Sequence, residues 1–436
     1  MIKPVRIEEV PAEKRLDGRR AAVVGAGKSG RSAARLLCAL GAAVRLLEKD
    51  PARVDRDFAA LCRERRIKIE YGEHIPEHFA GLDLVVLSPA VKARDIRPLL
   101  PAQNPPELMS ELELAGRYVN APILAITGTN GKSTTTSLAA HVLAAAGGKV
   151  FAGGNLGTPL AELAISGEKV DAAVVEVSSF QAQGLSTFRP AVGVLLNFAP
   201  DHMDWHQDMD EYLEAKLNLF GRMQPEDLVL LPESMREVLD RRDFTRARKE
   251  YFRPIDRFEC DVLPGEHNQA NMEAAFQACR RFGVEERDFR EALATFKPLP
   301  HRLQAVAERR GVLFVDDSKA TTVDAMEAAV KSFDRPVLLL AGGIYKGGDL
   351  AALVPLLKRK VRYVCLFGAS REVFEAAWAR HLPVKWEADL ETAMRRLFAM
   401  AKKGDVILLS PATSSFDLYA NYKERGDHFR RIAEAL

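Results

Sequence analysis

The chain has 436 residues, of which 47% are hydrophobic and 28% charged, with a formal net charge of +2 at pH 7. These proportions are typical of a globular protein with about three domains, and the balanced charge lacks the basic excess of a nucleic-acid-binding protein. The five cysteines form no C-x-x-C pair, which argues against a zinc or disulfide framework and suits a reducing cytoplasm.

The start of the chain lacks an apolar signal core, and no apolar run approaches the roughly 20 residues of a membrane span. We therefore expect a cytoplasmic protein that is not inserted in a membrane.

The first block of the sequence starts with the apolar run AAVVGAG, followed by a helical stretch and by the runs AVRLLEKD and LDLVVLSPAV. This alternation predicts a parallel, doubly wound sheet. Residues 25–30, GAGKSG, fit the dinucleotide fingerprint G-x-G-x-x-G but also contain the Gly-Lys-Ser ending of a P-loop. Both interpretations place a diphosphate at the start of a helix. Glu48 ends the next apolar run, close to where dinucleotide-binding folds recognise a ribose.

A proline-rich segment at 98–107, PLLPAQNPPE, predicts a linker. We expect residues 107–119 to form a helix that leads the chain into the second block. That block contains the runs PILAITGTNG, DAAVVEVSS, VGVLLNFAP and DLVLLPE. Each run ends in polar residues or glycine. Because ligands of such sheets bind beyond the carboxyl ends of the strands, we expect the functional residues there.

The segment GTNGKST at 128–134 lies between an apolar run and a helical run, which is the context of a P-loop. It departs from the strict pattern, because Ile126 stands at the first glycine position. Backbone N–H groups and the helix N-terminus favour an anion there. Lys132 would reach the outer phosphates, and the hydroxyl of Ser133 or Thr134 would bind Mg²⁺. A capped helix after a glycine turn is the alternative.

Metal ligands are expected after the neighbouring strands. Glu176 ends the run DAAVVEVSS, where P-loop enzymes place a second metal ligand, although a solvated strand end would look the same. His202 in APDHMDWH is a candidate metal or phosphate contact. Tyr212 and Lys216 share one helix face through their i,i+4 spacing, and such a lysine would ordinarily be a surface residue.

The third block follows LPHR at 299–302 and contains VLFVDDSK, PVLLLAGG, YVCLFGA and DVILLSPA, with helical stretches between. We predict an α/β protein of three domains. They are an N-terminal Rossmann-like domain at 1–105, a central P-loop ATPase-type domain at 106–300 and a C-terminal Rossmann-like domain at 301–436.

Taken together, GTNGKST, EVSSFQ, NFAPDHMDWH with YLEAK, LPGEHNQANMEAA, LPHR and DDSKAT resemble the Mur ligases, the ATP-dependent amino-acid-adding enzymes of peptidoglycan synthesis. Within that family, DDSKATT at 316–322 and LLSPATSSFDLYANYKERGDHF at 408–429 are similar to the members that add D-glutamate. The resemblance implies the substrates ATP, UDP-MurNAc-L-Ala and D-glutamate, two Mg²⁺ ions and an acyl-phosphate intermediate. We also expect a monomer, and the balanced charge predicts no nucleic-acid partner.

The resemblance also implies roles for individual residues. Those expected to hold ATP are Gly128, Thr129, Asn130, Gly131, Lys132, Ser133, Thr134, Thr135, Asn271, Arg302 and Asp317. Those expected to hold the UDP substrate are Gly25, Ala26, Gly27, Lys28, Ser29, Gly30, Glu48, Lys49, Ser88, Asn155, Ser178 and Gln181. The D-glutamate pocket would comprise Lys319, Thr321, Lys346, Ser415, Phe416 and Tyr422. The metal ligands would be Ser133, Glu176, His202 and Lys216 as its carbamate, and the catalytic residues Lys132, His202, Lys216 and Lys319.

The sequence departs from the usual family pattern at Glu48, Ala90, Ala182 and Ile344-Tyr345. Two other classes of protein compete with a ligase. A dehydrogenase would explain GAGKSG and Glu48 but not GTNGKST, and a regulatory NTPase switch would not explain the third block. A different Mur ligase, or a folylpolyglutamate synthase, which shares GTNGK, is the nearest alternative.

Overall fold

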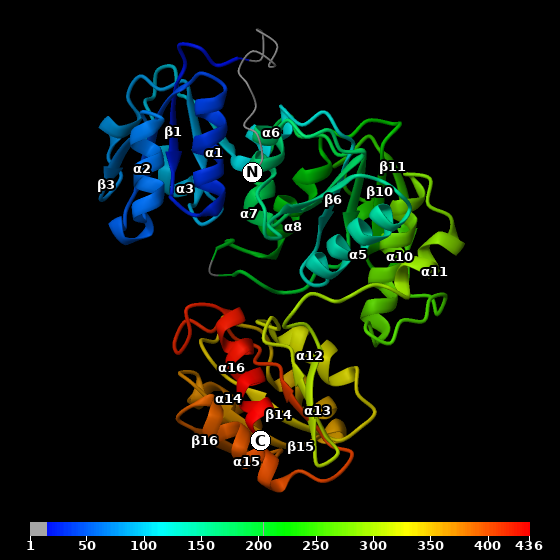
Figure 1. Ribbon diagram of the computed structural model, residues 1–436. Helices are drawn as coiled ribbons and strands as arrows, with labels where there is room; N and C mark the ends of the chain where they lie inside the picture. Colours follow the sequence, from blue (N-terminus) through cyan, green and yellow to red (C-terminus); the bar gives the residue numbers. More distant parts are fainter. Residues whose placement is uncertain (1–14, 204) are drawn as a thin grey trace. The chain divides into compact units, whose positions relative to one another are not determined.

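The computed structural model describes residues 15–203 and 205–436, which form three sheets flanked by helices (Figure 1). The chain divides into two compact units. One comprises the residues up to Asn197, Asp210–Arg253 and Met272–Ala294, and the other Phe198–Met209, Pro254–Asn271 and Thr295–Leu436. Among the described residues, no helix has the length and apolar character needed to cross a membrane.

The first sheet is five-stranded and parallel, in the order β3-β2-β1-β4-β5. Its strands are β1 (Arg20–Val24), β2 (Ala43–Glu48), β3 (Lys68–Tyr71), β4 (Leu84–Leu87) and β5 (Glu107–Ser110), with helices α1 (Lys28–Ala39), α2 (Arg56–Glu64) and α3 (Ala93–Ile96). The strand order changes direction between β1 and β4. Ligands of open α/β sheets bind in the crevice at such a point. We therefore expect the loops after β1 and β4 to bind a ligand.

The prediction of one helix over residues 107–119 is wrong in its first part. Residues Glu107–Ser110 form β5, which pairs with β4, and the helix α4 occupies only Glu111–Gly116. The helix starts there because the Ser110 hydroxyl accepts a hydrogen bond from the Glu113 N–H at 3.2 Å, as an N-cap does. The first sheet therefore extends past residue 105, and the three-domain boundaries stay a prediction.

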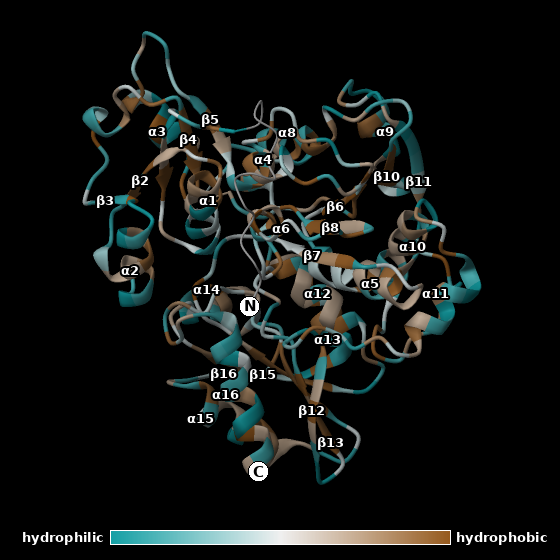
Figure 2. Cartoon of the chain, turned by 45° about the horizontal axis from the view of Figure 1, so that its top comes forward, coloured by the Kyte–Doolittle hydropathy of each residue, from teal (hydrophilic) through white to brown (hydrophobic). Residues whose placement is uncertain are grey.

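The second sheet is six-stranded and entirely parallel, in the order β11-β10-β9-β6-β8-β7. Its strands are β6 (Ile123–Thr127), β7 (Val150–Gly154), β8 (Ala172–Glu176), β9 (Val192–Leu195), β10 (Leu228–Pro232) and β11 (Arg248–Phe252). Hydrophobic residues run along β8 and β10 (Figure 2), as expected of strands covered on both faces. The helices are α5 (Lys132–Ala145), α6 (Leu160–Ser166), α7 (Ser179–Ala182), α8 (Met209–Leu217), α9 (Arg236–Asp240), α10 (Glu266–Arg280) and α11 (Glu286–Leu293).

The first and second sheets are joined inside one compact unit through α1, α4 and α6, which pack on one another. Glu162 of α6 accepts hydrogen bonds from the Ser32 hydroxyl at 2.5 Å and from Arg35 at 2.7 Å, both on α1. Glu111 of α4 accepts the Ala161 N–H at 2.7 Å.

The third sheet has the order β12-β13-β17-β14-β15-β16 and is parallel except for the edge strand β12. Its strands are β12 (Gln304–Arg309), β13 (Val312–Asp316), β14 (Val337–Ala341), β15 (Val361–Phe367), β16 (Val384–Glu387) and β17 (Val406–Leu409). Helices α12 (Val323–Lys331), α13 (Val354–Lys360) and α14 (Arg371–Trp378) bury apolar residues on one face, and α15 (Leu390–Met400) and α16 (Tyr422–Ala435) on the other. The predicted α/β class with parallel sheets is confirmed.

Candidate active site

The loop after β6 has the backbone geometry of an anion-binding turn. Gly128 has φ of +151° and Gly131 φ of +81°, a region that residues with a Cβ avoid. Helix α5 then begins at Lys132, with no side chain capping its first turn. The first turn of α5 therefore presents the positive end of a helix dipole beside the glycine loop.

Asn197, which follows β9, holds this loop in shape. Its Oδ1 accepts the N–H groups of Thr129 at 3.1 Å and Asn130 at 2.8 Å, and its Nδ2 donates to the Asn130 carbonyl at 3.1 Å. Asn197 belongs to the motif NFAP, but no role was predicted for it from the sequence. Its position directly after a strand could have indicated a role, because the carboxyl ends of neighbouring parallel strands lie at the same edge of a sheet.

Two lysines converge on the carbonyl oxygen of Gly128. The Nζ of Lys132 lies 2.8 Å from it and 2.7 Å from the Thr129 carbonyl. The Nζ of Lys216 also lies 2.8 Å from the Gly128 oxygen, although its side chain is only 1% exposed. The surface alternative for Lys216 is therefore wrong.

The predicted pairing of Tyr212 with Lys216 on one helix face is confirmed. The Lys216 Nζ lies 4.4 Å from the centroid of the Tyr212 ring, within the range of a cation–π contact. The Tyr212 hydroxyl lies 3.3 Å from the Thr129 hydroxyl. Helix α8 therefore contributes both side chains to the P-loop.

Glu176, at the end of β8, lies beside β6 in the sheet, and its Cα pairs with that of Ile126. Its Oε1 accepts a hydrogen bond from the Asn155 side chain at 2.6 Å. Its Oε2 is buried and, among the described residues, has no hydrogen-bond partner. An unsatisfied buried carboxylate oxygen calls for an explanation, and Mg²⁺ prefers such a ligand. This oxygen is therefore a candidate ligand for a cation, although the described residues contain no group of three or more His, Cys, Asp or Glu side chains that could hold a metal ion.

Ser178 and Gln181, expected at the UDP substrate, bind each other across the first turn of α7. The Ser178 hydroxyl accepts the Gln181 N–H at 3.3 Å, and the Gln181 Oε1 accepts the Ser178 N–H at 3.0 Å. This capping box leaves the Gln181 Nε2 buried and, within the described chain, without a partner. Asn155, expected at the same substrate, instead contacts Glu176.

The glycine loop after β1 is closely packed. A Cβ on Gly30 would lie 1.9 Å from the Gly25 carbonyl oxygen, and one on Gly25 would lie 2.9 Å from the Cβ of Ser88. Ser88 follows β4, which neighbours β1 where the strand order reverses. Both strands at the reversal therefore contribute residues to the glycine loop. Lys28 is exposed, and Lys49 pairs with Glu73 at 2.5 Å.

Glu48 has both carboxylate oxygens on backbone N–H groups. One oxygen accepts from Ala26 at 2.6 Å and the other from Asp50 at 3.0 Å, and the side chain is buried. This carboxylate therefore supports the backbone of the glycine loop.

In the third sheet, Asp317 follows β13 and accepts hydrogen bonds from the Ser410 hydroxyl at 3.0 Å and the Leu303 N–H at 3.2 Å. Burial raises the pKa of Asp317 to about 7, against the lowering effect of these bonds and of Arg302. Lys319 lies over the Tyr422 ring, with its Nζ 4.4 Å from the centroid. The structure thus brings together Lys319 and Tyr422, two members of the predicted D-glutamate pocket.

Among the other predicted residues of the second compact unit, Lys346 and His202 share one carboxylate partner, Asp201. Lys346 lies 3.7 Å from Asp201, His202 lies 3.2 Å from the same carboxylate, and the Asn271 side chain donates to Asn268 at 3.1 Å. Thr321 and Arg302 are half-buried, Ser415 is buried, and Phe416 is 71% exposed.

Arg425 in α16 is a functional candidate that the sequence analysis missed. Its buried guanidinium donates to the Ser318 carbonyl at 2.8 Å, the Thr413 carbonyl at 3.1 Å and the Ser318 hydroxyl at 2.9 Å. Burial lowers the pKa of Arg425 to about 10, so it remains charged at neutral pH. It joins the segment that carries Lys319 to the one that carries Ser415.

Comparisons with known proteins agree with this geometry. The model of the Mur ligase middle domain matches residues 126–252, and that of the Mur ligase, glutamate ligase domain matches residues 301–413. A protein of Oleidesulfovibrio alaskensis named UDP-N-acetylmuramoylalanine--D-glutamate ligase is 54% identical over 419 residues, covering 95% of this chain and 94% of the relative. A protein of the same name from Salinibacter ruber is 39% identical over 453 residues, covering 96% and 98%.

Solved structures show the same fold. MurF ligase from Thermotoga maritima, in complex with ADP, matches with a TM-score of 0.61 at 18% identity, covering 90% of this chain and 94% of that one. UDP-N-acetylmuramate-alanine ligase MurC from the same organism matches with a TM-score of 0.59 at 18% identity, covering 95% and 99%.

Proposed function

Because this chain belongs to the Mur ligase family, we propose that it catalyses the ATP-dependent addition of D-glutamate to UDP-N-acetylmuramoyl-L-alanine in peptidoglycan synthesis. The observation that carries the proposal is the near-full-length identity of 54% to a relative named for this reaction. The arrangement of Lys132, Lys216 and Glu176 around the P-loop supports it independently.

In the proposed reaction, the terminal carboxylate of the UDP substrate attacks the γ-phosphorus of ATP and displaces ADP, which forms an acyl phosphate. The amine of D-glutamate then attacks the acyl carbon. The resulting tetrahedral intermediate loses a proton from nitrogen and expels phosphate, leaving an amide. Each species is strongly anionic, so fixed positive charge stabilises the transition states.

Lys132 would supply part of that charge. Its Nζ now donates to two loop carbonyls, and a bound nucleotide would offer phosphate oxygens as stronger acceptors for the same ammonium group. The first turn of α5 and the N–H groups of the loop would hold the remaining phosphate oxygens. Asn271, Arg302 and Asp317 are proposed as further nucleotide contacts.

Magnesium would be held by Ser133, Glu176, His202 and carbamylated Lys216. When bound, it would neutralise charge on the transferring phosphoryl group. The unpartnered Oε2 of Glu176 supports this assignment. Carbamylation of Lys216 would leave one N–H on Nζ, enough to keep the bond to Gly128, while adding two carboxylate-like oxygens.

The two Gly-Lys-Ser loops would divide the binding of phosphate. The loop at 25–30, with Ser88 beside it and Glu48 beneath it, would hold the diphosphate of the UDP substrate, and the loop at 128–134 would hold ATP. Lys49, Asn155, Ser178 and Gln181 are proposed along the same substrate. Lys319, Thr321, Lys346, Ser415, Phe416 and Tyr422 are proposed as the D-glutamate pocket, where cations and hydroxyls would bind two carboxylates. We also propose that the protein acts as a monomer in the cytoplasm.

The direct test is ADP release by the purified protein. Release should require both UDP-MurNAc-L-Ala and D-glutamate and should match the amide formed. Equal release with L-lysine, diaminopimelate or a folate would reject the assignment. Nucleotide turnover without amide would favour an NTPase switch, and oxidation of NADH with carbonyl compounds would favour a dehydrogenase.

A further inference from the structure

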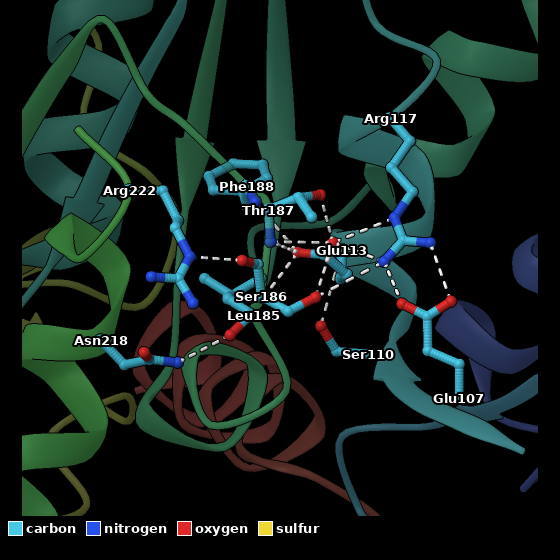
Figure 3. Close-up of polar contacts among 10 residues, drawn as sticks. All are labelled: Glu107, Ser110, Glu113, Arg117, Leu185, Ser186, Thr187, Phe188, Asn218 and Arg222. Carbon is cyan, nitrogen blue, oxygen red and sulfur yellow. Dashed lines mark hydrogen bonds and ion pairs between the residues drawn. The ribbon is translucent and has the colours of Figure 1, made fainter. Parts of the chain in front are cut away.

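Glu113 is a buried carboxylate on α4, with a side chain that is 0% exposed (Figure 3). A charge in such a place is costly unless hydrogen bonds satisfy it. Glu113 accepts the N–H groups of Ser186 at 2.9 Å, Thr187 at 3.1 Å and Phe188 at 3.0 Å. The hydroxyls of Ser186 and Thr187 also donate, at 3.1 and 2.5 Å. Three successive N–H groups thus converge on one anion, in the manner of a backbone nest.

Arg117, one turn further along α4, completes the shell around Glu113. Its guanidinium donates to Glu113 at 2.9 and 3.0 Å and also pairs with Glu107. Burial alone would raise the pKa of Glu113, but the hydrogen bonds from Thr187, Ser186 and Arg117 outweigh it and lower the pKa to about 2. The side chain is therefore a carboxylate at every pH at which the protein would work.

The segment bound by Glu113 directly continues α7. We call residues 182–188, which run from the end of α7 toward β9, the junction segment. Its Gly184 lies against the start of α4, since the Ser110 N–H donates to the Gly184 carbonyl at 3.3 Å. A Cβ on Gly184 would lie 2.8 Å from the Ser110 nitrogen. The junction segment is thus fixed to α4 by its N–H groups and by a close backbone approach.

The carbonyl groups of the junction segment are bound from the other side, by residues just after α8. The Asn218 Nδ2 donates to the Ala182 carbonyl at 2.7 Å and to the Leu185 carbonyl at 3.0 Å. Arg222 donates to the Ser186 carbonyl at 2.5 Å (Figure 3). Asn218 is the second residue after Lys216, so the end of α8 that carries Lys216 is tied to the end of α7.

The junction segment therefore connects two parts of the active site. On one side, α7 carries Ser178 and Gln181 and follows Glu176. On the other, α8 carries Lys216 at the P-loop. The distance between Glu176 and Lys216, which are proposed to share a metal, depends on how α7 and α8 are held. Displacements of about 1 Å in such a site can lower a rate by roughly 100-fold.

We propose that Glu113 and Asn218 are positioning residues for the ligase reaction, which clamp the junction segment from opposite sides and so set the position of the Ser178–Gln181 turn relative to Lys216. This inference rests on the proposed function. Neither residue need touch a substrate, because each acts through the backbone of the junction segment.

The test compares Asn218→Ala with Glu113→Gln. Asn218 is exposed, so its variant should fold even if Glu113→Gln does not. For Asn218→Ala we expect kcat to fall about tenfold and KM for the UDP substrate to rise several-fold. The Kd of a non-hydrolysable ATP analogue should stay within about twofold, because the contacts of the P-loop with Asn197 are unchanged. Glu113→Gln should show the same pattern with a larger fall in kcat.

Glu111→Gln is the matched control. Glu111 is also a buried glutamate of α4, but it accepts from Ala161 of α6 rather than from the junction segment. We expect its kcat and KM values to stay within about twofold of wild type. Wild-type kinetics in folded Asn218→Ala would overturn the proposal, as would equal losses in Glu111→Gln.

Hydrogen exchange separates this proposal from the proposed function. In Asn218→Ala, without substrates, amides of 183–188 and of the end of α8 should exchange faster, while those of α6 should not change. If wild type forms no amide, the proposed function fails, and the exchange pattern still decides whether the clamp exists. Unchanged exchange at both places would reject the clamp even in an active enzyme.

Discussion

The Nζ of Lys216 lies 2.8 Å from the carbonyl oxygen of Gly128, although 88 residues separate them in the chain. This contact places a buried amine at the start of the P-loop, next to the ammonium group of Lys132. Two neighbouring ammonium groups repel each other. A bound triphosphate would offset this repulsion, and carbamylation of Lys216 would remove one of the two positive charges.

Lys216→Ala should therefore abolish most ligase activity, by about 100-fold or more if a metal ligand is lost. Added formate or acetate should restore part of it, because a short carboxylate would occupy the place of the carbamate oxygens. The measurement is ADP release with and without the carboxylate. The control is Lys149→Ala, at an exposed lysine that pairs with Glu168. It should keep wild-type activity both with and without the added carboxylate. Full activity of Lys216→Ala would exclude the carbamate role.

Asn197→Ala should weaken ATP binding. The substitution removes an acceptor for Thr129 and Asn130 and a donor to Asn130, and each bond is worth about 1 kcal/mol. We expect the Kd for ATP to rise roughly tenfold or more, measured by calorimetry with a non-hydrolysable analogue. Asn197→Asp keeps the accepting oxygen but adds a negative charge beside the loop, so its Kd for ATP should also rise. An unchanged Kd in both variants would mean that the loop holds its shape without Asn197.

Gly30→Ala should impair binding of the UDP substrate and leave ATP binding intact. The new Cβ would lie 1.9 Å from the Gly25 carbonyl oxygen, so the first glycine loop would have to move. Initial-rate kinetics should show a higher KM for UDP-MurNAc-L-Ala and a KM for ATP within about twofold of wild type. Equal increases in both KM values would show that the roles of the two Gly-Lys-Ser loops are wrongly divided.

Glu111→Gln should flatten the pH dependence of stability. Burial, with Glu162 nearby, raises the pKa of Glu111 from 4.5 to about 7, so the folded state retains a proton that the unfolded state releases. The stabilisation is complete below pH 4.5 and is lost as the pH rises through about 7, an effect of about 3 kcal/mol.

The measurement is the urea midpoint of wild type and Glu111→Gln at pH 5 and pH 8. The wild-type midpoint should fall more between the two pH values than that of the variant. Parallel falls would mean that Glu111 ionises in the folded protein as it does in the unfolded chain.

Local sequence patterns predicted much of the fold and part of the site. Runs of apolar residues with polar ends predicted strands, and glycine spacing predicted the tight turns at both glycine loops. The pairing of Tyr212 with Lys216 also followed from sequence, because i,i+4 spacing on a helix is a local relation. The four residues of β5 were missed, because ELMS is too short to show a period and becomes a strand through pairing with β4.

The remaining features depend on which strands become neighbours. Asn197 contacts the P-loop and Glu176 lies beside the strand that leads into it, because β9 and β8 lie on the two sides of β6. No local pattern specifies this order. Two carboxylates likewise bind backbone groups that are distant in the sequence. Glu48 accepts a hydrogen bond from the Ala26 N–H, and Glu113 accepts three from N–H groups more than 70 residues away. The sequence by itself thus determined the kinds of elements and the chemistry they carry. The tertiary structure decided which oxygens are satisfied and which are left for a ligand, because hydrogen bonds between distant segments form only once the sheets have brought them together.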